Sequence, residues 1–462
     1  MSFLDFLAQY FPLIVVKKYL QRRITGIIIA CFFLLQCLRI FFIHHLGRGE
    51  INEGLWKDAL LLLLAFIAFV GWLLWRKYPK ARKDRIGIAI GICCEQDTEQ
   101  RRLRNDFIEA LRAKIQAQHQ DVFDVIELQE YHSERLTKLR ETTLFLKRTW
   151  SHLLIFGRCK RRLHEGQMSY VLELNVSVRH APLTKEISNN LVIRMKKCFP
   201  GGVVFPEAEE LNGFVVTRDF IEHASMYILG EAALLSRDPL TAFALHRRLW
   251  NEIKQLPFVP SVPVSLGFIQ SQLPKELVEE GIYSANWYYR TRPEQFEKKM
   301  KDCLDVVQEL DPSNYVAHLI KATYFFLIDD IENAKKEIYL ARTEKDQKWR
   351  FSDAFLVAYE GNLSSAHQIY WRAFQGPFED FVPLDVEEFI AKVLNRKPDK
   401  FQLYYCLGLI NFFCKKDYTA AKRDFAQFIA KASKKNQFPG EVAFAKQYLV
   451  RCDTELFSKA RN

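Results

Sequence analysis

The sequence lacks the short motifs that mark most nucleotide-binding and hydrolytic enzymes. No Walker loop, GxSxG elbow, HExxH zinc motif or dinucleotide-binding glycine pattern occurs among its 462 residues. Its ten cysteines are scattered, without the CxxC spacing of zinc sites and redox motifs. We therefore expect a reducing compartment, no disulfides, no catalytic residues, no metal and no cofactor, and an enzyme is the least favoured class.

A general excess of positive charge is also missing once the start of the chain is set aside. The net charge is +11, and residues 1–85 carry 13 Lys and Arg against 5 Asp and Glu. The remaining 377 residues carry 53 basic against 50 acidic side chains. This near balance argues against a broad phosphate-binding face, so we expect no nucleic-acid partner.

Two long apolar runs stand near the start of the chain. Residues 24–43 form a run of 20 with Arg39 as its one charge, and residues 59–75 form a run of 17. A helix of the first length spans roughly 30 Å, which is the thickness of a bilayer core. Residue types that anchor helices at membrane interfaces stand at or near the ends of the second run: Trp56, Trp72, Trp75, Arg76 and Lys77. Residues 24–85 therefore predict a two-helix transmembrane hairpin with a basic flank, with membrane lipid as a partner.

The distribution of Lys and Arg around these runs predicts an orientation. Four precede the first run, six follow the second, and two lie between them. This asymmetry places both termini and the soluble domains in the cytoplasm, at a membrane that we expect to be the bacterial inner membrane. Residues 1–23 predict an interfacial amphipathic segment, with a disordered tail as the alternative. The alternative to the hairpin is a pair of buried core helices.

Residues 86–221 predict an α/β domain with a mixed sheet. The continuous apolar run Ile86–Cys94 is typical of a strand covered on both faces. Two more strands are expected at Val122–Leu128 and Ser151–Gly157, with helical patterns between them. This β-α-β-α-β order favours parallel strands with right-handed crossovers.

The second half of this domain has a different pattern. Residues Tyr170–Val178 alternate as a half-exposed strand does, after a charged turn at residues 158–166. A further strand is expected at Asn190–Arg194. The order and spacing of Ile86–Ile90, Leu153–Gly157 and Tyr170–Leu174 resemble the α/β module of TolB-like and CsgG-like proteins. The resemblance implies a module joined to membrane segments and helical repeats.

Residues 222–462 predict an all-α solenoid with a period near 34. Small residues recur where paired helices would cross: Gly230, Ala242, Ala322, Ala334, Ala341, Gly361, Ala366, Gly408 and Ala421. Asp238, Asp330, Asn362 and Asp417 align with them. The pattern is similar to tetratricopeptide repeats, and that resemblance implies a protein partner bound in a concave groove. The alternative is a non-repetitive helical bundle.

Two groups of residues in the α/β domain are candidates for a ligand or surface site. Cys93 and Cys94 end the first strand, where open α/β sheets bind ligands. A cysteine-dependent activity would need a nearby histidine, which His132, His152, His164 or His180 could supply. The alternative is that both cysteines are buried small hydrophobes. The second group is the densest basic cluster outside the membrane flanks, with a solvated hairpin as its alternative: Arg158, Lys160, Arg161 and Arg162.

Together these features favour a multidomain membrane protein that acts as a scaffold or sensor. It would bind a protein partner through the repeats, and a ligand or second partner through the α/β domain. The alternative is a two-span membrane effector of a bacterial defence-type system, which would homo-oligomerise and perturb the membrane when its cytosolic part is triggered.

Overall fold

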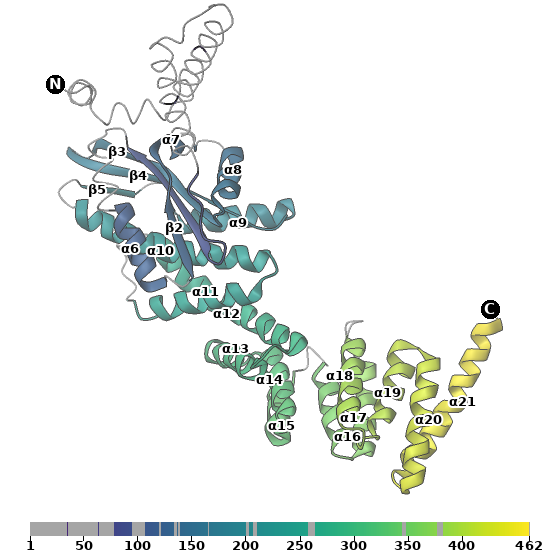
Figure 1. Cartoon of the computed structure of the whole chain (residues 1–462). Helices are drawn as coiled ribbons and strands as arrows, with labels where there is room; N and C mark the ends of the chain where they lie inside the picture. The colour runs from purple at the N-terminus through teal and green to yellow at the C-terminus, as the bar shows by residue number, and fades with distance from the viewer. Residues whose placement is uncertain are drawn as a thin grey trace, which may run out of the picture. The chain divides into compact units, whose positions relative to one another are not determined.

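The structure is a computed structural model, and it describes most of the chain after residue 77. The described residues are 78–94, 107–119, 122–133, 136, 139–164, 166–199, 203–206, 210–256, 264–343, 348–376 and 382–461, with the single positions 35 and 63. The chain divides into two compact units, Met1–Leu273 and Pro274–Asn462 (Figure 1). The predicted boundary after residue 221 lies inside helix α10 (Glu210–Leu235), which runs through it without a break.

Unit 1 is built around the predicted mixed sheet. Its strands are β1 (Ile86–Cys94), β2 (Phe123–Glu127), β3 (Leu153–His164), β4 (Gln167–Val178) and β5 (Val203–Pro206). They lie in the order β2-β1-β3-β4-β5. Strand β1 is parallel to both β2 and β3, whereas β4 is antiparallel to β3 and β5. The three parallel strands follow the predicted order.

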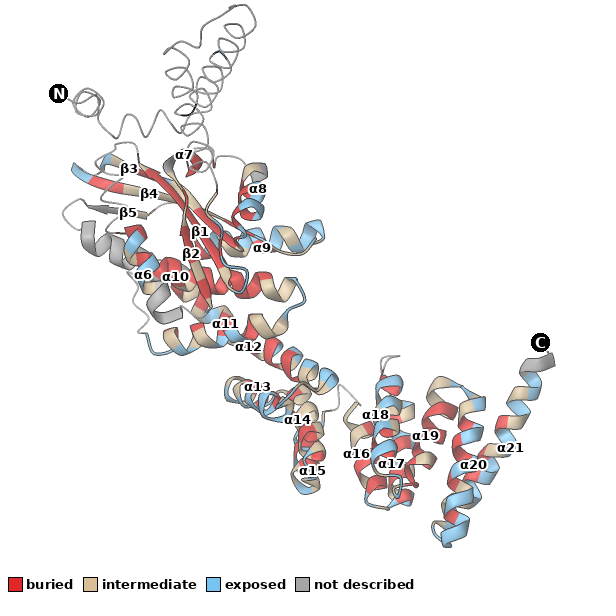
Figure 2. Cartoon of the chain, viewed as in Figure 1, coloured by how far each residue is buried: buried red, intermediate tan, exposed pale blue. Residues whose placement is uncertain are grey.

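Helices cover both faces of this sheet. The helices that surround the sheet are α6 (Ala110–His119), α7 (Glu130–Ser133), α8 (Leu139–Thr149), α9 (Lys185–Cys198) and α10, and α11 (Pro239–Ile253) packs on α10. Ala89 and Leu154 pack in one core with Phe145 of α8. Helix α6 contacts β2, and α10 contacts β4, β5 and α6. Side chains of a strand point alternately to the two faces of the sheet, so a strand that is covered on both faces needs apolar residues at successive positions. Strand β1 meets this condition, and Figure 2 shows it as buried along most of its length.

Two predictions in unit 1 are wrong in detail. Strand β3 continues to His164, through most of the expected charged turn. Asn190–Arg194 is not a strand and lies within α9. Only Leu191 and Cys198 of that helix are buried. They are seven residues apart, which is two helical turns, so both side chains lie on the same face of the helix. The backbone N–H of Ile187 also donates to the Thr184 hydroxyl, which caps the helix.

Four helix pairs share one connecting turn. They are α10 with α11, α14 (Tyr315–Leu327) with α15 (Ile331–Leu340), α16 (Lys348–Tyr359) with α17 (Leu363–Gln375), and α19 (Leu403–Ile410) with α20 (Tyr418–Lys435). In each pair the cap of the second helix accepts a hydrogen bond of 3.0–3.1 Å from the backbone three residues later: Asp238, Asp330, Asn362 and Asp417. The residue before each cap has a left-handed backbone conformation, with φ values of 63°, 61°, 99° and 54° for Arg237, Asp329, Gly361 and Lys416.

The small residues lie where the two helices of a pair cross. Ala242, Ala334, Ala366 and Ala421 are at most 1% exposed. On the first helices the corresponding buried positions are Gly230, Ala322, Ala354 and Gly408. Ala341 is buried as well, whereas Gly361 lies in the turn itself. The C-terminal half therefore contains repeated helix pairs, as the sequence predicted.

The fourth pair contains one extra residue before its cap. The backbone N–H of Asp417 bonds Asn411, six residues earlier, whereas that of Asp330 bonds Phe325, five earlier. A short π-helix, η3 (Asn411–Lys415), accommodates the insertion. The turn and the crossing are therefore preserved although the spacing between the copies is irregular.

The left-handed position of this turn gives a stability prediction. We expect Gly361→Ala to lower the free energy of unfolding by about 1 kcal/mol, since a Cβ is disfavoured at positive φ. Lys416 holds the same position in the fourth pair and already carries a Cβ, so Lys416→Ala should change stability by less than about 0.5 kcal/mol. Urea denaturation followed by circular dichroism checks both values, and equal losses would contradict the turn assignment.

Unit 2 has one continuous hydrophobic core. Its other helices are α12 from Pro274 onward (the whole helix is Val264–Thr291), α13 (Phe296–Leu310), α18 (Val382–Arg396) and α21 (Pro439–Arg461). The core extends from Ala322 of α14 to Cys452 of α21 without interruption. The helix pairs of this unit are therefore packed as one body.

The prediction of a transmembrane hairpin at an inner membrane is corrected. Among the residues that the structure describes, no helix is both long and apolar enough to cross a membrane. The longest described helix, α12, has Lys275, Glu276, Glu279 and Glu280 within two turns, and such charges are costly in a bilayer. The predicted interfacial segment 1–23 lies outside the described residues, as do the expected anchors: Arg39, Trp56, Trp72, Trp75, Arg76 and Lys77.

Candidate functional site

An apolar groove lies among the helices of unit 2. It has a volume of about 210 Å³. Helices α12, α14, α15, α16 and α18 contribute its lining: Asn286, Tyr289, Ile320, Ala322, Thr323, Phe326, Ile338, Phe351, Ser352, Phe355, Leu356, Asp385, Val386 and Phe389. Because helices from successive pairs supply these residues, no single stretch of sequence contains the groove.

Three phenylalanines from three helices line the groove and contact one another. The Phe355 ring centroid lies 5.1 Å from that of Phe326 and 4.9 Å from that of Phe389, both in edge arrangements. Phe326 and Phe355 are buried, and Phe389 is half-buried. This contact fixes the rings in place and leaves part of Phe389 accessible to a ligand.

A few polar groups lie along the groove. Asn286, Thr323 and Ser352 are half-buried lining residues that can form directional hydrogen bonds. Burial raises the pKa of the Tyr289 hydroxyl, which is therefore neutral at physiological pH. Asp385 faces Arg290 at 3.6 Å, and both side chains are at least half exposed, so this ion pair is weak.

A smaller cavity adjoins the apolar groove and has the opposite character. Its volume is about 140 Å³, and it shares Phe326 and Phe389 with the groove. Its polar lining has four cations and one carboxylate: Arg292, Lys392, Arg396, Lys397 and Asp329. We call the two cavities together the aromatic–basic groove. It has an apolar end and a cationic end, joined at two phenylalanines.

Some of these cations already have partners within the chain. Lys397 bonds the Asp329 carboxylate, and this hydrogen bond raises the pKa of the lysine. Lys392 bonds Glu388 one turn earlier on α18. Both pairs are largely exposed to solvent and therefore exchange readily for an incoming anion. The lining of the two cavities contains neither cysteine nor histidine.

The structure brings together the two predicted candidate groups of the α/β domain. The register of β1 and β3 places Cys93 beside Arg158 and Cys94 beside Cys159. Cys93 is buried, and its Sγ lies 3.5 Å from the Gly157 carbonyl oxygen. The strand register therefore places the two groups next to each other at the C-terminal end of β1, and their role as a ligand site stays a prediction.

The rest of the basic cluster runs along the β3–β4 hairpin. Lys160 forms an ion pair of 2.6 Å with Glu173 of β4. Arg161 is half-buried, and Arg162 is exposed and bonds the Arg161 carbonyl oxygen at 3.0 Å. These contacts are those of a solvated hairpin edge.

The four histidines considered as partners of the cysteines lie at different places in unit 1. His152 lies beside Gly87, at the opposite end of β1 from Cys93. His132 stacks on Tyr78 at 4.4 Å between ring centroids. His164 ends β3, and His180 follows β4.

Two cysteines of unit 2 have thiols of low reactivity. Burial raises the pKa values of the Cys406 and Cys414 thiols to about 12, so both are protonated at neutral pH.

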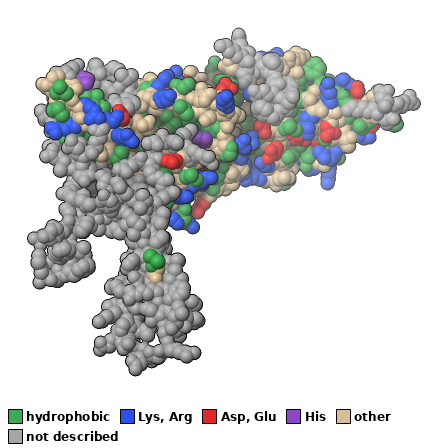
Figure 3. Space-filling view, turned by 90° about the horizontal axis from the view of Figure 1, so that it is seen from above, with side chains coloured by type: hydrophobic (Ala, Val, Ile, Leu, Met, Phe, Trp, Pro, Cys, Tyr) green, Lys and Arg blue, Asp and Glu red, His purple; other side chains and the backbone are tan. Residues whose placement is uncertain are grey.

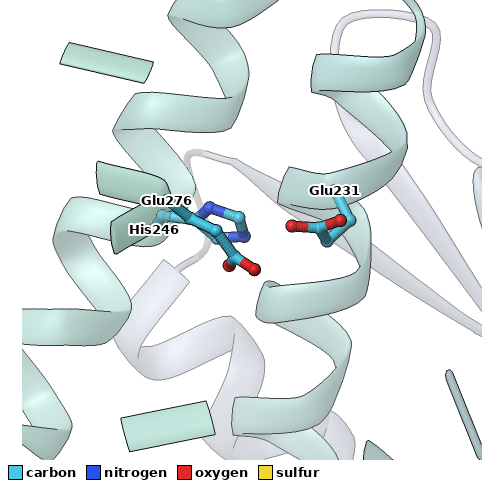
Figure 4. A group of neighbouring side chains, drawn as sticks. All are labelled: Glu231, His246 and Glu276. Atoms are coloured by element: carbon cyan, nitrogen blue, oxygen red, sulfur yellow. The ribbon is translucent and has the colours of Figure 1, made fainter. Parts of the chain in front are cut away.

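Sequence reasoning missed a buried group of acidic residues and a histidine. Figure 4 shows two of these side chains in unit 1, Glu231 on α10 and His246 on α11, and also Glu276 on α12. Such residue types can hold a metal ion. Glu231 is also paired with Arg194 at 2.8 Å, and the His246 ring hydrogen-bonds the Tyr227 carbonyl oxygen at 2.9 Å. The isolated carboxylate of Glu231 within the apolar end of α10 was the available signal.

No known protein family, curated protein or solved structure matches this chain. Function is therefore argued from the site alone. Lys and Arg side chains lie in several separate groups with acidic ones among them on the face that Figure 3 presents.

Proposed function

We propose that this protein is a scaffold or sensor whose unit 2 binds an extended segment of a protein partner in the aromatic–basic groove. The segment has an apolar side chain, which enters the apolar end, and acidic residues next to it, which meet Arg292, Lys392, Arg396 and Lys397. The repeated helix pairs supply the rigid walls. A tetratricopeptide-like architecture is part of this proposal and rests on the shared turns and crossings.

The observation that supports the proposal most is the junction of the two cavities at Phe326 and Phe389. A ligand that fills only the apolar end gains burial of one side chain, which contributes roughly 2 kcal/mol. A ligand that also reaches the cationic end gains charge-assisted hydrogen bonds, which specify its direction. An extended peptide can span both ends because its residues advance roughly 3.3 Å each.

The first test is selection of 12-residue peptides from a random display library against the full chain. We expect the selected peptides to share an aromatic or large aliphatic residue followed within a few positions by Asp or Glu. Lys392→Glu combined with Arg396→Glu, both exposed on α18, should abolish this enrichment without disturbing the fold.

The matched control reverses two exposed lysines that line neither cavity, Lys434 on α20 and Lys446 on α21. This variant has the same net charge as the test variant and should retain the enrichment. Enrichment of basic peptides, or equal loss in both variants, would refute the proposed orientation of the ligand.

A further inference from the structure

A second large cavity belongs to unit 1 and lies at an unexpected end of its sheet. It has a volume of about 750 Å³, within the range of small-molecule sites. Ile86, Val122 and His152 line it where β1, β2 and β3 begin. Helices α10 and α11 form the facing wall. The predicted ligand cluster around Cys93 lies at the other end of these parallel strands.

The charged lining of this cavity is mainly cationic. Its four cations are Lys83, Arg85, Arg179 and Arg248, and its two carboxylates are Asp84 and Asp238. The Asp238 carboxylate already has a hydrogen-bond donor, because it caps α11 and accepts from the backbone N–H of Thr241 at 3.1 Å. Three of the cations are guanidinium groups, which match phosphate oxygens with two parallel hydrogen bonds.

A histidine adds a neutral donor beside these cations. The backbone N–H of Gly87 donates to Nδ1 of His152 at 3.1 Å, so the hydrogen of the neutral ring is on Nε2. Burial, and then the nearby Arg179, lower the pKa of His152 and favour this neutral form. The lining therefore offers a hydrogen-bond donor without the cost of a further buried charge.

The facing wall is apolar and made of alanines and leucines. It consists of residues from α10 and α11: Leu229, Ala232, Ala233, Leu240, Ala244 and Leu245. A flat or apolar molecular body can lie against such a wall while its charged end reaches the arginines.

We propose that this cavity binds a phosphorylated small molecule of nucleotide size, with its phosphates at Arg179 and Arg248 and its apolar body against α10 and α11. This ligand site is distinct from the aromatic–basic groove. The inference rests on unit 1 alone and is independent of the proposed peptide binding.

The test is calorimetric titration of the full chain with ATP, pyrophosphate and adenosine at low and at physiological salt. We expect saturable binding of ATP, weaker binding of pyrophosphate and none of adenosine. Arg179→Gln with Arg248→Gln should weaken ATP binding at least about tenfold, since two charge-assisted contacts are lost. Added salt should weaken binding to the wild type more than to this variant.

Two further variants separate the parts of the site. Arg247→Gln removes an exposed arginine next to Arg248 that does not line the cavity, and it should bind ATP as the wild type does. Ala244→Trp fills the space beside the exposed face of α11, and it should weaken ATP binding more than pyrophosphate binding. Unchanged thermal unfolding shows that each variant is folded.

Absence of saturable ATP and pyrophosphate binding would overturn the proposal. Equal losses in Arg247→Gln and in the double variant would overturn the assignment of the two arginines. Equal affinities of the wild type for ATP and pyrophosphate would overturn the assignment of the apolar wall.

Discussion

Replacing Gly408 by valine is expected to lower the free energy of unfolding of unit 2 by about 3 kcal/mol. A Cβ at Gly408 would lie 2.5 Å from Cε1 of Phe425, well inside van der Waals contact. Phe425 is fully buried, and its ring centroid stacks 5.4 Å from that of Tyr448, so the ring has little room to move away. The substitution therefore separates α19 from α20. Chemical denaturation followed by circular dichroism measures the loss.

Gly440 provides the matched control, because no atom lies within 4 Å of a Cβ added there. Gly440→Val should change stability by less than about 0.5 kcal/mol. Combining Gly408→Val with Phe425→Leu should cost less than the sum of the two single variants, by at least about 1 kcal/mol. Strict additivity would show that the two residues do not share the helix crossing.

The second large effect is expected at Glu337, where alanine should cost about 3 kcal/mol. Its carboxylate lies 2.6 Å from Nδ1 of His318 and 3.1 Å from Nζ of Lys321. Glu337 and His318 are both more than nine-tenths buried. Removing the carboxylate leaves these donors in a low-dielectric site without the acceptor they share. Because the contact joins α15 to α14, its loss also loosens one wall of the aromatic–basic groove.

Glu332 lies on the same helix and tests whether burial matters. Its side chain is 78% exposed and pairs with Lys335 at 3.3 Å. Glu332→Ala should therefore cost less than about 0.5 kcal/mol. Thermal unfolding of the two variants side by side gives the comparison, and similar losses would mean that the buried contact adds nothing beyond a surface pair.

The sequence predicted correctly those elements that depend only on neighbouring residues in the chain. The apolar run Ile86–Cys94 became β1 with the predicted ends, since a strand covered on both faces needs no alternation. The aligned residues Asp238, Asp330, Asn362 and Asp417 all became helix caps, because a cap depends on one side chain and a backbone N–H three residues away.

Features that depend on distant contacts could not be read in this way. Asn190–Arg194 is β-branched and apolar enough for a strand, but Val192 and Ile193 lie largely exposed on α9. A short apolar run does not by itself show whether its buried residues recur with the spacing of a strand or of a helix. Strand β5 has four residues and pairs with β4, so its sequence carries little signal of its own.

Neither cavity used in the proposals was predicted as a site. The rule that ligands bind at the carboxyl ends of parallel strands pointed to Cys93 and Cys94. The large cavity of unit 1 instead lies where the strands begin, and its arginines come from 85 to 248 along the chain. The aromatic–basic groove collects residues from Asn286 to Lys397. The sequence predicted a peptide groove along the repeats without naming these residues, and peptide binding there stays a prediction.

A charge-swap titration tests the proposed peptide binding most directly. A fluorescent peptide from the selection is titrated with the wild-type chain and with the Lys392→Glu, Arg396→Glu variant, and a second peptide has Lys in place of each acidic residue. We predict that the wild type prefers the acidic peptide at least about tenfold and that the variant prefers the basic one. The same preference in both proteins, or loss of both peptides in the variant, would contradict binding across the aromatic–basic groove.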